Sequence, residues 1–277
     1  MDGENRGTPP NVSVVIAAKN AATTIETAIL SALREPEVGS VVVVDDGSTD
    51  QTADVARRAD DGTGRVRVLS FRENSGPSFA RNRGIEAGEE PFIAILDADD
   101  FFFPGRFANL FKQQQWDLIA DNIAFFSEKT APSTASQIVE SFDPQPWKLD
   151  LANFVRGNIK PRGIARSELG FLKPVMRRAF LDHHRLRYDE TLRLGEDYEL
   201  YTKALALKAR FKVIRHCGYG AIVRSSSLSG QHSTADLDRL ANVDAKLLER
   251  KDLTKPERQA IHAHEAATRN RYRLRYY

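Results

Sequence analysis

Three aspartates lie close together in the segment AILDADDFFFPGRF, which spans residues 94–107. Asp97, Asp99 and Asp100 follow a short apolar run and precede a run of phenylalanines. Carboxylates this close repel one another unless a cation or hydrogen-bond donors lie among them. Their oxygens are hard ligands of the kind that Mg²⁺ and Mn²⁺ bind. The segment therefore predicts a ligand site, although an acidic turn at the end of a strand is the simpler interpretation.

Two further acidic groups could carry chemistry. Asp45 and Asp46 end the apolar run VVVVDD and begin the turn DGSTD, where a helix cap is the structural alternative. The segment GED, residues 195–197, begins a stretch with an amphipathic helical pattern, YELYTKALAL. Glu196 and Asp197 are therefore expected at a helix N-terminus, where a solvated cap is again the structural alternative.

The first hundred residues alternate between strand and helix patterns. The predicted strands span 12–18, 40–46, 65–71 and 92–96, and the predicted helices span 21–33, 47–59 and 76–88. This order is typical of an α/β, Rossmann-like fold with a mostly parallel central sheet and helices on both faces. Ligands bind such sheets at the carboxyl ends of their strands. The clusters at Asp45 and Asp97 are therefore expected in one crevice.

The second half of the chain has a less regular pattern. We expect a helix over 104–115, a strand within 117–126, a loop over 129–146, helices over 174–184 and 197–207, and a strand over 210–214. From Ala235 to the end the sequence favours a pair of charged helices, which would form a C-terminal helical extension.

Composition excludes several classes of protein. The 40 basic and 38 acidic side chains nearly balance, which argues against a nucleic-acid-binding protein. The single Cys217 excludes an internal disulfide and fits a reducing compartment. No apolar run approaches roughly 18 residues, and the first residues are polar. We therefore expect a cytoplasmic protein without a signal peptide or a membrane span.

Basic residues are concentrated in two segments. Nine Lys or Arg and two acids lie between Arg156 and Arg187, and the segment from Arg269 carries four Arg and no acid. Both are candidate surfaces for anions, and contact with the surface of a membrane is a further expectation.

Five motifs occur in an order that resembles the inverting glycosyltransferases of family 2, which have the GT-A fold. They are VSVVIAAKN, VVVVDDGSTD, SGPSFARNRGI, ILDADD and GEDYEL, and the resemblance covers residues 12 to about 232. The segments LKPVMRRAFLDHHRLRYDETLRLGEDYELYTKAL and SLSGQHS resemble the bacterial exopolysaccharide enzymes of this family, including the succinoglycan type. Those enzymes build repeat units on a lipid carrier.

The resemblance implies roles for four aspartates. Asp99 is expected to bind the metal, Mg²⁺ or Mn²⁺, and Asp97 the sugar nucleotide. Asp46 matches the position whose carboxylate accepts a hydrogen bond from the uracil N–H, so a UDP-sugar is the expected donor. Asp197 matches the catalytic base, which takes the proton of the acceptor hydroxyl as that oxygen attacks the anomeric carbon.

Other residues on the donor side follow from the same motifs. Ala17 and Lys19 in AAKN are expected at the nucleotide, although many family members have a proline and an aromatic residue there. Arg81 of ARNRG is expected to point toward the nucleotide. His232 of SGQHS is expected as a further metal ligand, although a lone His in a polar loop is usually only exposed.

On the acceptor side, Glu196 is expected to bind the acceptor. The basic segment LKPVMRR places Lys173 and Arg177 where they could contact an acceptor diphosphate. The alternative for both is an ordinary solvated helix face.

The implied function is transfer of a sugar, with glucose suggested by the resemblance, from UDP to a saccharide acceptor on a polyprenyl diphosphate. Transfer would invert the anomeric centre and take place at the cytoplasmic face of the membrane. Residues 1–234 would form the catalytic domain, with a nucleotide-sugar half over about 10–126 and an acceptor half over 127–234. Residues 235–277 would form the helical extension.

Two alternatives stay open. A sugar nucleotidyltransferase shares an α/β nucleotide fold, but it needs a glycine-rich phosphate loop after the first strand, and AAKNAATT contains no glycine. A non-catalytic module that binds a nucleotide or Mg²⁺, such as a receiver domain, gathers its acids after the first and third strands, whereas here they follow the second and fourth. A position of Asp197 far from the metal would favour the second alternative.

Overall fold

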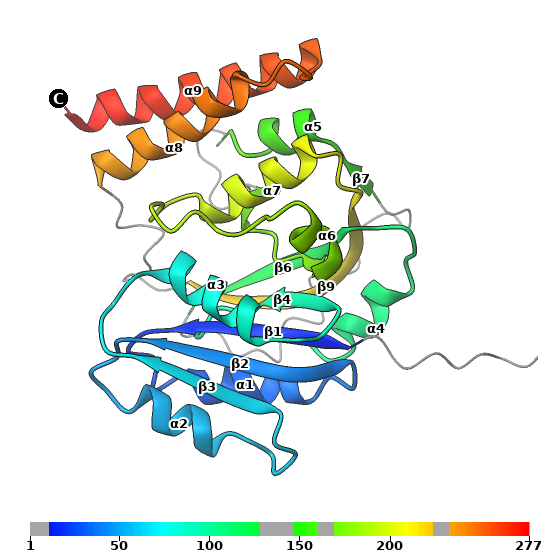
Figure 1. Cartoon of the computed structure of the whole chain (residues 1–277), viewed down its shortest axis with the longest axis vertical. Helices are drawn as coiled ribbons and strands as arrows, with labels where there is room; N and C mark the ends of the chain where they lie inside the picture. The colour runs from blue at the N-terminus through cyan, green and yellow to red at the C-terminus, as the bar shows by residue number, and fades with distance from the viewer. Residues whose placement is uncertain (1–10, 128–146, 160–168, 224–232, 277) are drawn as a thin grey trace, which may run out of the picture.

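A mixed sheet runs through the centre of the molecule, with helices on both of its faces (Figure 1). The computed structural model describes residues 11–127, 147–159, 169–223 and 233–276. The strand order is β3-β2-β1-β4-β8-β6-β9-β5, and β7 pairs with β9 outside this path. The predicted α/β class is confirmed.

Four parallel strands form the first part of the sheet, as predicted. The strands are β1 (Val12–Ala18), β2 (Val38–Asp46), β3 (Val66–Phe71) and β4 (Phe92–Ile95), and the helices between them are α1 (Ile25–Leu33), α2 (Thr52–Arg58) and α3 (Pro77–Ala87). In Figure 1, α3 lies above this part of the sheet and α1 and α2 lie below it.

Burial of both faces explains why these strands are apolar throughout. Val14 and Ile16 of β1 pack in the same core cluster as Ile25 of α1, whereas Val15 packs with Ile85 of α3. Successive side chains of a strand point to opposite faces, so each face needs its own apolar set. Because the strands are parallel, the carboxyl ends of β2 and β4 lie at one edge of the sheet.

The second part of the sheet combines both strand directions. Its elements are β5 (Phe101–Phe102), α4 (Arg106–Phe111), β6 (Leu118–Ser127), β7 (Trp147–Leu149), α5 (Leu151–Arg156), β8 (Val175–Arg177), α6 (Arg178–His183), α7 (Glu196–Ala206) and β9 (Phe211–Val223). Strand β8 is antiparallel to both of its neighbours, β4 and β6, while β6 and β9 are parallel. Strands β5 and β7 are antiparallel to β9.

The helix predicted over 174–184 is wrong in its first part. Val175 and Met176 are fully buried in strand β8, and only Arg178–His183 is helical. Two neighbouring strands supply the hydrogen bonds of β8, so long-range pairing overrides the local helical pattern.

Other boundaries also differ from the prediction. Strand β9 continues to Val223, nine residues beyond the predicted end at 214, and α4 ends at Phe111 rather than near 115. The short helix α5 was not predicted, although Asp150 caps it by accepting a hydrogen bond from the Asn153 N–H at 2.7 Å. The loop predicted over 129–146 lies outside the described residues.

Two helices at the C-terminal end, α8 (Thr234–Leu248) and α9 (Lys255–Tyr276), pack against α5 and α7. They lie along the top of the molecule in Figure 1. Helix α8 begins with a capping box formed by Ser233 and Asp236. Ile261 of α9 belongs to the same core cluster as Phe154 of α5 and Tyr201 of α7. None of the helices that the structure describes combines the length and the apolarity that a membrane span requires.

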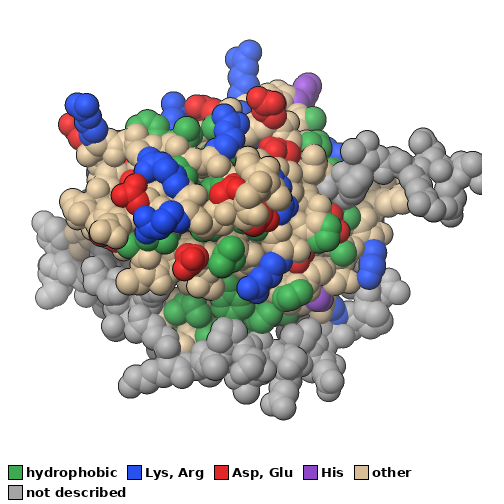
Figure 2. All heavy atoms as spheres, turned by 90° about the horizontal axis from the view of Figure 1, so that it is seen from below, with side chains coloured by type: hydrophobic (Ala, Val, Ile, Leu, Met, Phe, Trp, Pro, Cys, Tyr) green, Lys and Arg blue, Asp and Glu red, His purple; other side chains and the backbone are tan. Residues whose placement is uncertain are grey.

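Charged side chains of both signs share the surface that Figure 2 shows from below. Helix α2 and the turn after it carry such pairs, with Arg57 2.9 Å from Asp54 and Arg65 2.9 Å from Asp61. Exposed pairs of this kind contribute little to stability.

Candidate active site

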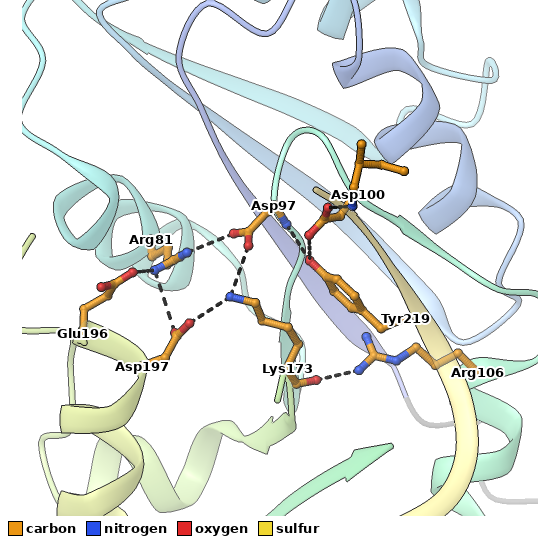
Figure 3. A network of polar contacts seen from close by, with 9 residues as sticks. Arg81, Asp97, Asp100, Arg106, Lys173, Glu196, Asp197 and Tyr219 are labelled. Carbon is orange, nitrogen blue, oxygen red and sulfur yellow. Dashed lines mark hydrogen bonds and ion pairs between the residues drawn. The ribbon is translucent and has the colours of Figure 1, made fainter. Parts of the chain in front are cut away.

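Two cations and three carboxylates form a connected network beyond the carboxyl end of β4 (Figure 3). Arg81 pairs with Asp97 at 2.9 Å and with Glu196 at 2.7 Å. Lys173 pairs with Asp97 at 3.1 Å and with Asp197 at 2.8 Å. Asp97 and Asp197 are thus joined through one ammonium group. The structure brings together five predicted site residues that come from four separate segments.

Each of these side chains is placed by a different element. Arg81 extends from α3 and Asp97 follows β4, while Lys173 lies just before β8. Glu196 and Asp197 form the first turn of α7, directly after Gly195, whose φ of 75° is in the left-handed region. Gly195 lacks a Cβ, so it adopts this conformation without strain. The turn therefore directs both carboxylates back toward α3 and β4.

Burial and charge pairing shift the pKa values in this network. Burial alone lowers the pKa of Lys173, but Asp197 and Asp97 outweigh it, and the pKa lies above its ordinary value. Burial alone raises the pKa of Asp97, but Lys173 and Arg81 hold it well below its usual range. Lys173 is therefore an ammonium and Asp97 a carboxylate at neutral pH.

One oxygen of Asp197 is suited to accept a proton. Its Oδ2 accepts from Lys173, whereas Oδ1 is buried and makes no well-formed hydrogen bond to any described residue. Arg81 lies 3.8 Å from Oδ1, an ion-pair distance but too long for a hydrogen bond. A carboxylate oxygen with unused acceptor capacity is what a general base requires.

Asp100 joins the acidic segment to the last part of β9. Its two oxygens accept from the Tyr219 hydroxyl and from the Ile222 N–H, both at 2.8 Å. The Tyr219 hydroxyl also accepts from the Asp97 N–H at 3.1 Å. Burial, together with the charges of Asp97 and Asp99, raises the pKa of Asp100 to about 7.

Behind Lys173, a buried ion pair fixes the backbone. Arg106 of α4 donates to the Lys173 carbonyl at 2.5 Å and pairs with Asp121 of β6 at 3.0 Å. Arg106 and Asp121 are both fully buried. This support positions Lys173, which otherwise lies in a short connection before β8.

Asp46 ends β2 and holds the protein's own backbone. Its carboxylate accepts from the N–H groups of Ser75 and Gly76, at 2.9 and 2.6 Å, and so fixes the start of α3. The neighbouring Asp45 accepts from the Ser48 N–H at 3.1 Å through one oxygen. The pair does not cap the next helix, α2, whose N-cap residue Gln51 makes no side-chain cap hydrogen bond. Asp46 would have to bind a nucleotide base in addition to the backbone groups before α3.

The segment after β1 is tied to the segment after β2. Asn20, with a φ of 50°, donates its N–H to Ser48 Oγ at 2.9 Å and accepts from the Thr49 N–H at 2.9 Å. Next to it, Ala17 is half-buried and Lys19 is exposed. This places both predicted nucleotide contacts at the carboxyl end of β1, beside that of β2.

The acidic segment supplies carboxylate oxygens, which divalent cations prefer, but those of Asp97 pair with Arg81 and Lys173, and those of Asp100 accept from Tyr219 and Ile222. Asp99 is half-buried between Asp97 and Asp100, and the two neighbouring charges contribute to the raised pKa of Asp100. Such an excess of negative charge favours a cation of higher charge. Within the described residues, however, no three His, Cys, Asp or Glu side chains are grouped as a metal site. His232, the other predicted ligand, lies outside the described residues.

Arg177 does not lie in this network. It is the register partner of Phe92, at the amino end of β4, whereas Asp97 follows the opposite end. Its guanidinium lies 5.1 Å from the ring centroids of both Phe92 and Trp116 and donates to the Trp116 carbonyl. Lys173 and Arg177 lie on either side of β8 and therefore at opposite edges of the sheet, and the acceptor contact of Arg177 stays a prediction.

Several supporting residues were not predicted from the sequence. Tyr188 lies with its ring centroid 5.4 Å from the Arg81 guanidinium, and its backbone N–H and carbonyl both bond to the Asn82 side chain, at 3.0 and 2.9 Å. Asn82 belongs to the ARNRG motif, so its motif position could have indicated a role. Tyr219 lies within the long strand β9, where the sequence pattern does not distinguish it from an ordinary core residue.

Residues 13–181, more than half of the chain, match the family model described as glycosyl transferase family 2. The chain belongs to glycosyl transferase family 2. The fold class and the type of enzyme that the motifs suggested are thereby confirmed.

Family members from Rhizobium meliloti are similar over most of their length. The succinoglycan biosynthesis protein ExoU is 55% identical over 269 residues, which cover 97% of this chain and 78% of that protein. The succinoglycan biosynthesis protein ExoO is 36% identical over 248 residues, which cover 87% of this chain and 69% of that protein.

Solved structures of other glycosyltransferases share the fold. S. aureus TarS 1-349 in complex with UDP-GlcNAc has a TM-score of 0.71 at 20% identity, covering 95% of this chain and 72% of that one. The mannosyltransferase PcManGT from Pyrobaculum calidifontis, in complex with GDP-Man and Mn²⁺, has a TM-score of 0.63 at 17% identity, covering 94% and 70%. These matches establish the family's GT-A fold.

Proposed function

We propose that this chain transfers a sugar from a UDP-sugar to a hydroxyl of a lipid-linked saccharide, with inversion, during synthesis of a succinoglycan-type exopolysaccharide. The observation that carries the proposal is the single ammonium of Lys173 shared by Asp97 and Asp197. It holds the proposed donor-binding carboxylate and the proposed base next to each other. A non-catalytic binding module has no need of the second carboxylate.

Asp197 would act as the general base. Its carboxylate would take the acceptor proton as the acceptor oxygen attacks the anomeric carbon, and the bond from that carbon to the diphosphate would break in the same step. One displacement of this kind inverts the anomeric centre. Glu196, paired with Arg81, lies beside it in the first turn of α7 and would orient the acceptor.

Asp97, Arg81 and Lys173 would form the donor side. Arg81 and Lys173 are the cations of the network, and either could pair with a diphosphate in exchange for a carboxylate. Asp99 would hold Mg²⁺ or Mn²⁺, with His232 as a second candidate ligand. When bound, the ion supplies positive charge that stabilises the departing diphosphate, so no general acid is needed.

Uracil would lie near Ala17, Lys19 and the pair Asp45–Asp46. The Asp45 carboxylate becomes a candidate acceptor for the uracil N–H beside Asp46, because Asp46 already binds two backbone N–H groups. The similarity to ExoU supports the exopolysaccharide pathway, and the UDP-GlcNAc complex of TarS supports a uridine nucleotide. Glucose stays the suggested sugar.

Titration calorimetry tests the donor assignment. UDP, CDP and GDP are titrated into wild type and Asp99→Asn, with and without Mn²⁺. We expect UDP alone to bind, with Mn²⁺ strengthening the binding, and we expect Asp99→Asn to lose that strengthening. Equal binding of all three nucleotides, or of none, would refute the UDP-sugar assignment.

The helical extension and its arginines would meet a lipid surface. Arg271 and Arg273 are exposed near the end of α9. Replacing both by Glu should weaken co-sedimentation with phosphatidylglycerol vesicles and leave binding to phosphatidylcholine vesicles unchanged, because the attraction is electrostatic. Equal sedimentation of the variant and the wild type with anionic vesicles would count against this membrane contact.

A further inference from the structure

A second polar cluster is buried on the far side of α7 from the active-site network. Tyr198 of α7 donates its hydroxyl to Asp244 Oδ1 at 2.7 Å, and His264 Nδ1 contacts Asp244 Oδ2 at 2.6 Å. Asp244 is fully buried, and Tyr198 and His264 are 4% and 6% exposed. The three side chains come from α7, α8 and α9 and join these helices by polar contacts within an apolar core.

Each hydrogen bond of this cluster has a defined donor and a defined acceptor. Asp244 as a carboxylate can only accept, so the His264 contact requires a proton on Nδ1. Burial and the charge of Asp244 raise the pKa of Tyr198 well above its ordinary value, so the phenol stays a donor. The Tyr198 ring also stacks on His264, with ring centroids 4.3 Å apart and planes 25° apart. Stacking and hydrogen bonding together fix the orientation of Tyr198.

Tyr198 directly follows Asp197 in the first turn of α7. Successive side chains of a helix point about 100° apart, so one turn directs Asp197 to Lys173 and Tyr198 to Asp244. A rotation of α7 about its axis would break both contacts at once. The direction of Tyr198 thus determines the direction of Asp197.

Helix α8 also contacts the turn that precedes α7. A Cβ at Gly195 would lie 2.6 Å from a methyl group of Leu240, so α8 packs directly on the backbone at this point. This contact is independent of the Tyr198–Asp244 hydrogen bond. It places α8 against the same turn from which Glu196 and Asp197 extend.

We propose that Asp244 and His264 are positioning residues of the transferase, which orient Asp197 through Tyr198 and the first turn of α7. The proposal rests on the proposed role of Asp197 as base. The C-terminal helices are then part of the catalytic apparatus, although none of their residues in this cluster touches the network around Lys173.

Variants of the cluster test this on the full chain. Tyr198→Phe keeps the ring and removes the donor, and His264→Leu removes the donor to Asp244. His264→Asn keeps an N–H group near the position of Nδ1. The rate is measured as UDP release from UDP-glucose with Mn²⁺ by hydrolysis, in which water takes the place of the acceptor hydroxyl and free glucose is the second product. The affinity for UDP is measured by calorimetry. Ile29→Ala, in the separate core cluster under α1, is the control for a general loss of stability.

We expect Tyr198→Phe and His264→Leu to lower kcat at least tenfold and to change the Kd for UDP less than twofold. His264→Asn should recover most of the lost rate. Ile29→Ala should keep kcat at temperatures where it is folded. Rates of Tyr198→Phe and His264→Leu within twofold of wild type, or equal losses in Ile29→Ala, would overturn the proposal.

Hydrogen exchange tests the positioning without any activity. We expect the amides of residues 199–202, which donate to carbonyls of the first turn of α7, to exchange at least tenfold faster in Tyr198→Phe than in wild type, and unchanged exchange there in Ile29→Ala. Unchanged exchange in Tyr198→Phe would overturn the positioning role. If wild type neither binds UDP nor releases it from UDP-glucose although exchange responds as expected, the positioning of the turn holds and the proposed transfer function fails.

Discussion

Lys173 is a single ammonium shared by two carboxylates. Comparing it with a surface lysine shows how burial changes the contribution of an ion pair to stability. Its side chain is 9% exposed, whereas that of Lys208, which pairs with Glu257 at 3.2 Å, is 61% exposed. Removing one partner of a buried ion pair leaves the other charge without compensation. Removing one partner of an exposed pair costs little, because water replaces it.

Lys173→Met should therefore lower the free energy of unfolding by about 3 kcal/mol at pH 7, measured by urea titration. Lys208→Met, the matched control, should lower it by less than about 1 kcal/mol. Because the folded-state pKa of Lys173 is raised, its contribution is fully present below pH 10.5 and is lost as the pH rises above that value. Equal effects of the two variants at pH 7 would show that Lys173 is solvated.

Asp197→Asn should lower the rate of sugar transfer by at least about a hundredfold, the range that general base catalysis supplies. An amide is almost the same size as a carboxylate but cannot take the proton. Affinity for UDP, measured by calorimetry, should change little, since Asp197 is proposed to act on the acceptor. Transfer at the wild-type rate would exclude Asp197 as the base.

At the scale of elements, the first part of the sheet was predictable and the second part was not. Strands β1 to β4 are apolar on both faces, so their runs are visible in the sequence. Strand β8 has only three residues, and it is a strand because β4 and β6 lie on either side of it. That one missed strand also separates Arg177 from Lys173, since residues on opposite ends of a strand reach opposite edges of the sheet.

The candidate site was predictable to a different extent. Motif order indicated Asp97, Asp197 and Arg81, and the structure brings them into one network. The partners of these residues could not be predicted from the sequence, because ion pairs between residues 16 to 115 positions apart depend on the fold. A solvated face was one expectation for Lys173, but its ammonium lies between the half-buried carboxylate of Asp97 and the buried carboxylate of Asp197.

Helix α4 offers an element-scale prediction. Glu35 accepts from the Gly105 and Phe107 N–H groups, at 2.8 and 3.2 Å, and so holds the start of the helix that carries Arg106. Burial raises the pKa of Glu35 above its ordinary value of 4.5. The folded state therefore binds the proton more tightly than the unfolded state, and stability falls as the pH rises from 4.5 through the raised folded-state value.

Glu35→Gln cannot titrate, so it should lack this decrease. The free energy of unfolding of wild type minus that of Glu35→Gln should decrease as the pH is raised from 4 to 7. It is measured by urea titration at several pH values. Glu26→Gln, at an exposed position of α1, is the control and should show a constant difference. A difference that widens with pH would mean that the pKa of Glu35 is lowered in the folded state.

At the scale of the whole molecule, the C-terminal helices share one core with the catalytic fold. Ile261 of α9 is fully buried in the cluster that also contains Leu118 of β6 and Val15 of β1. A shared core implies a single cooperative unfolding transition, whereas a separate extension would unfold on its own.

Ile261→Ala should lower the stability of the entire protein by about 3 kcal/mol, because it leaves a cavity in that core. Tryptophan fluorescence and far-UV circular dichroism should report the same midpoint in both wild type and variant. Ala263→Ser, at an exposed position of the same helix, should change stability by less than about 0.5 kcal/mol. Two separate transitions would show that residues 235–277 form an independent unit.

The place of β8 in the sheet has a consequence for how the chain is made. A ribosome releases β1 to β4 long before β8, since Ile95 and Val175 are 80 residues apart. Until Val175 emerges, the β4 edge of a nascent parallel sheet has no partner strand, and its exposed backbone can pair with another chain. During synthesis the protein therefore passes through a stage in which self-association competes with folding. That stage lasts until the three residues of β8 have been synthesised and can pair with β4.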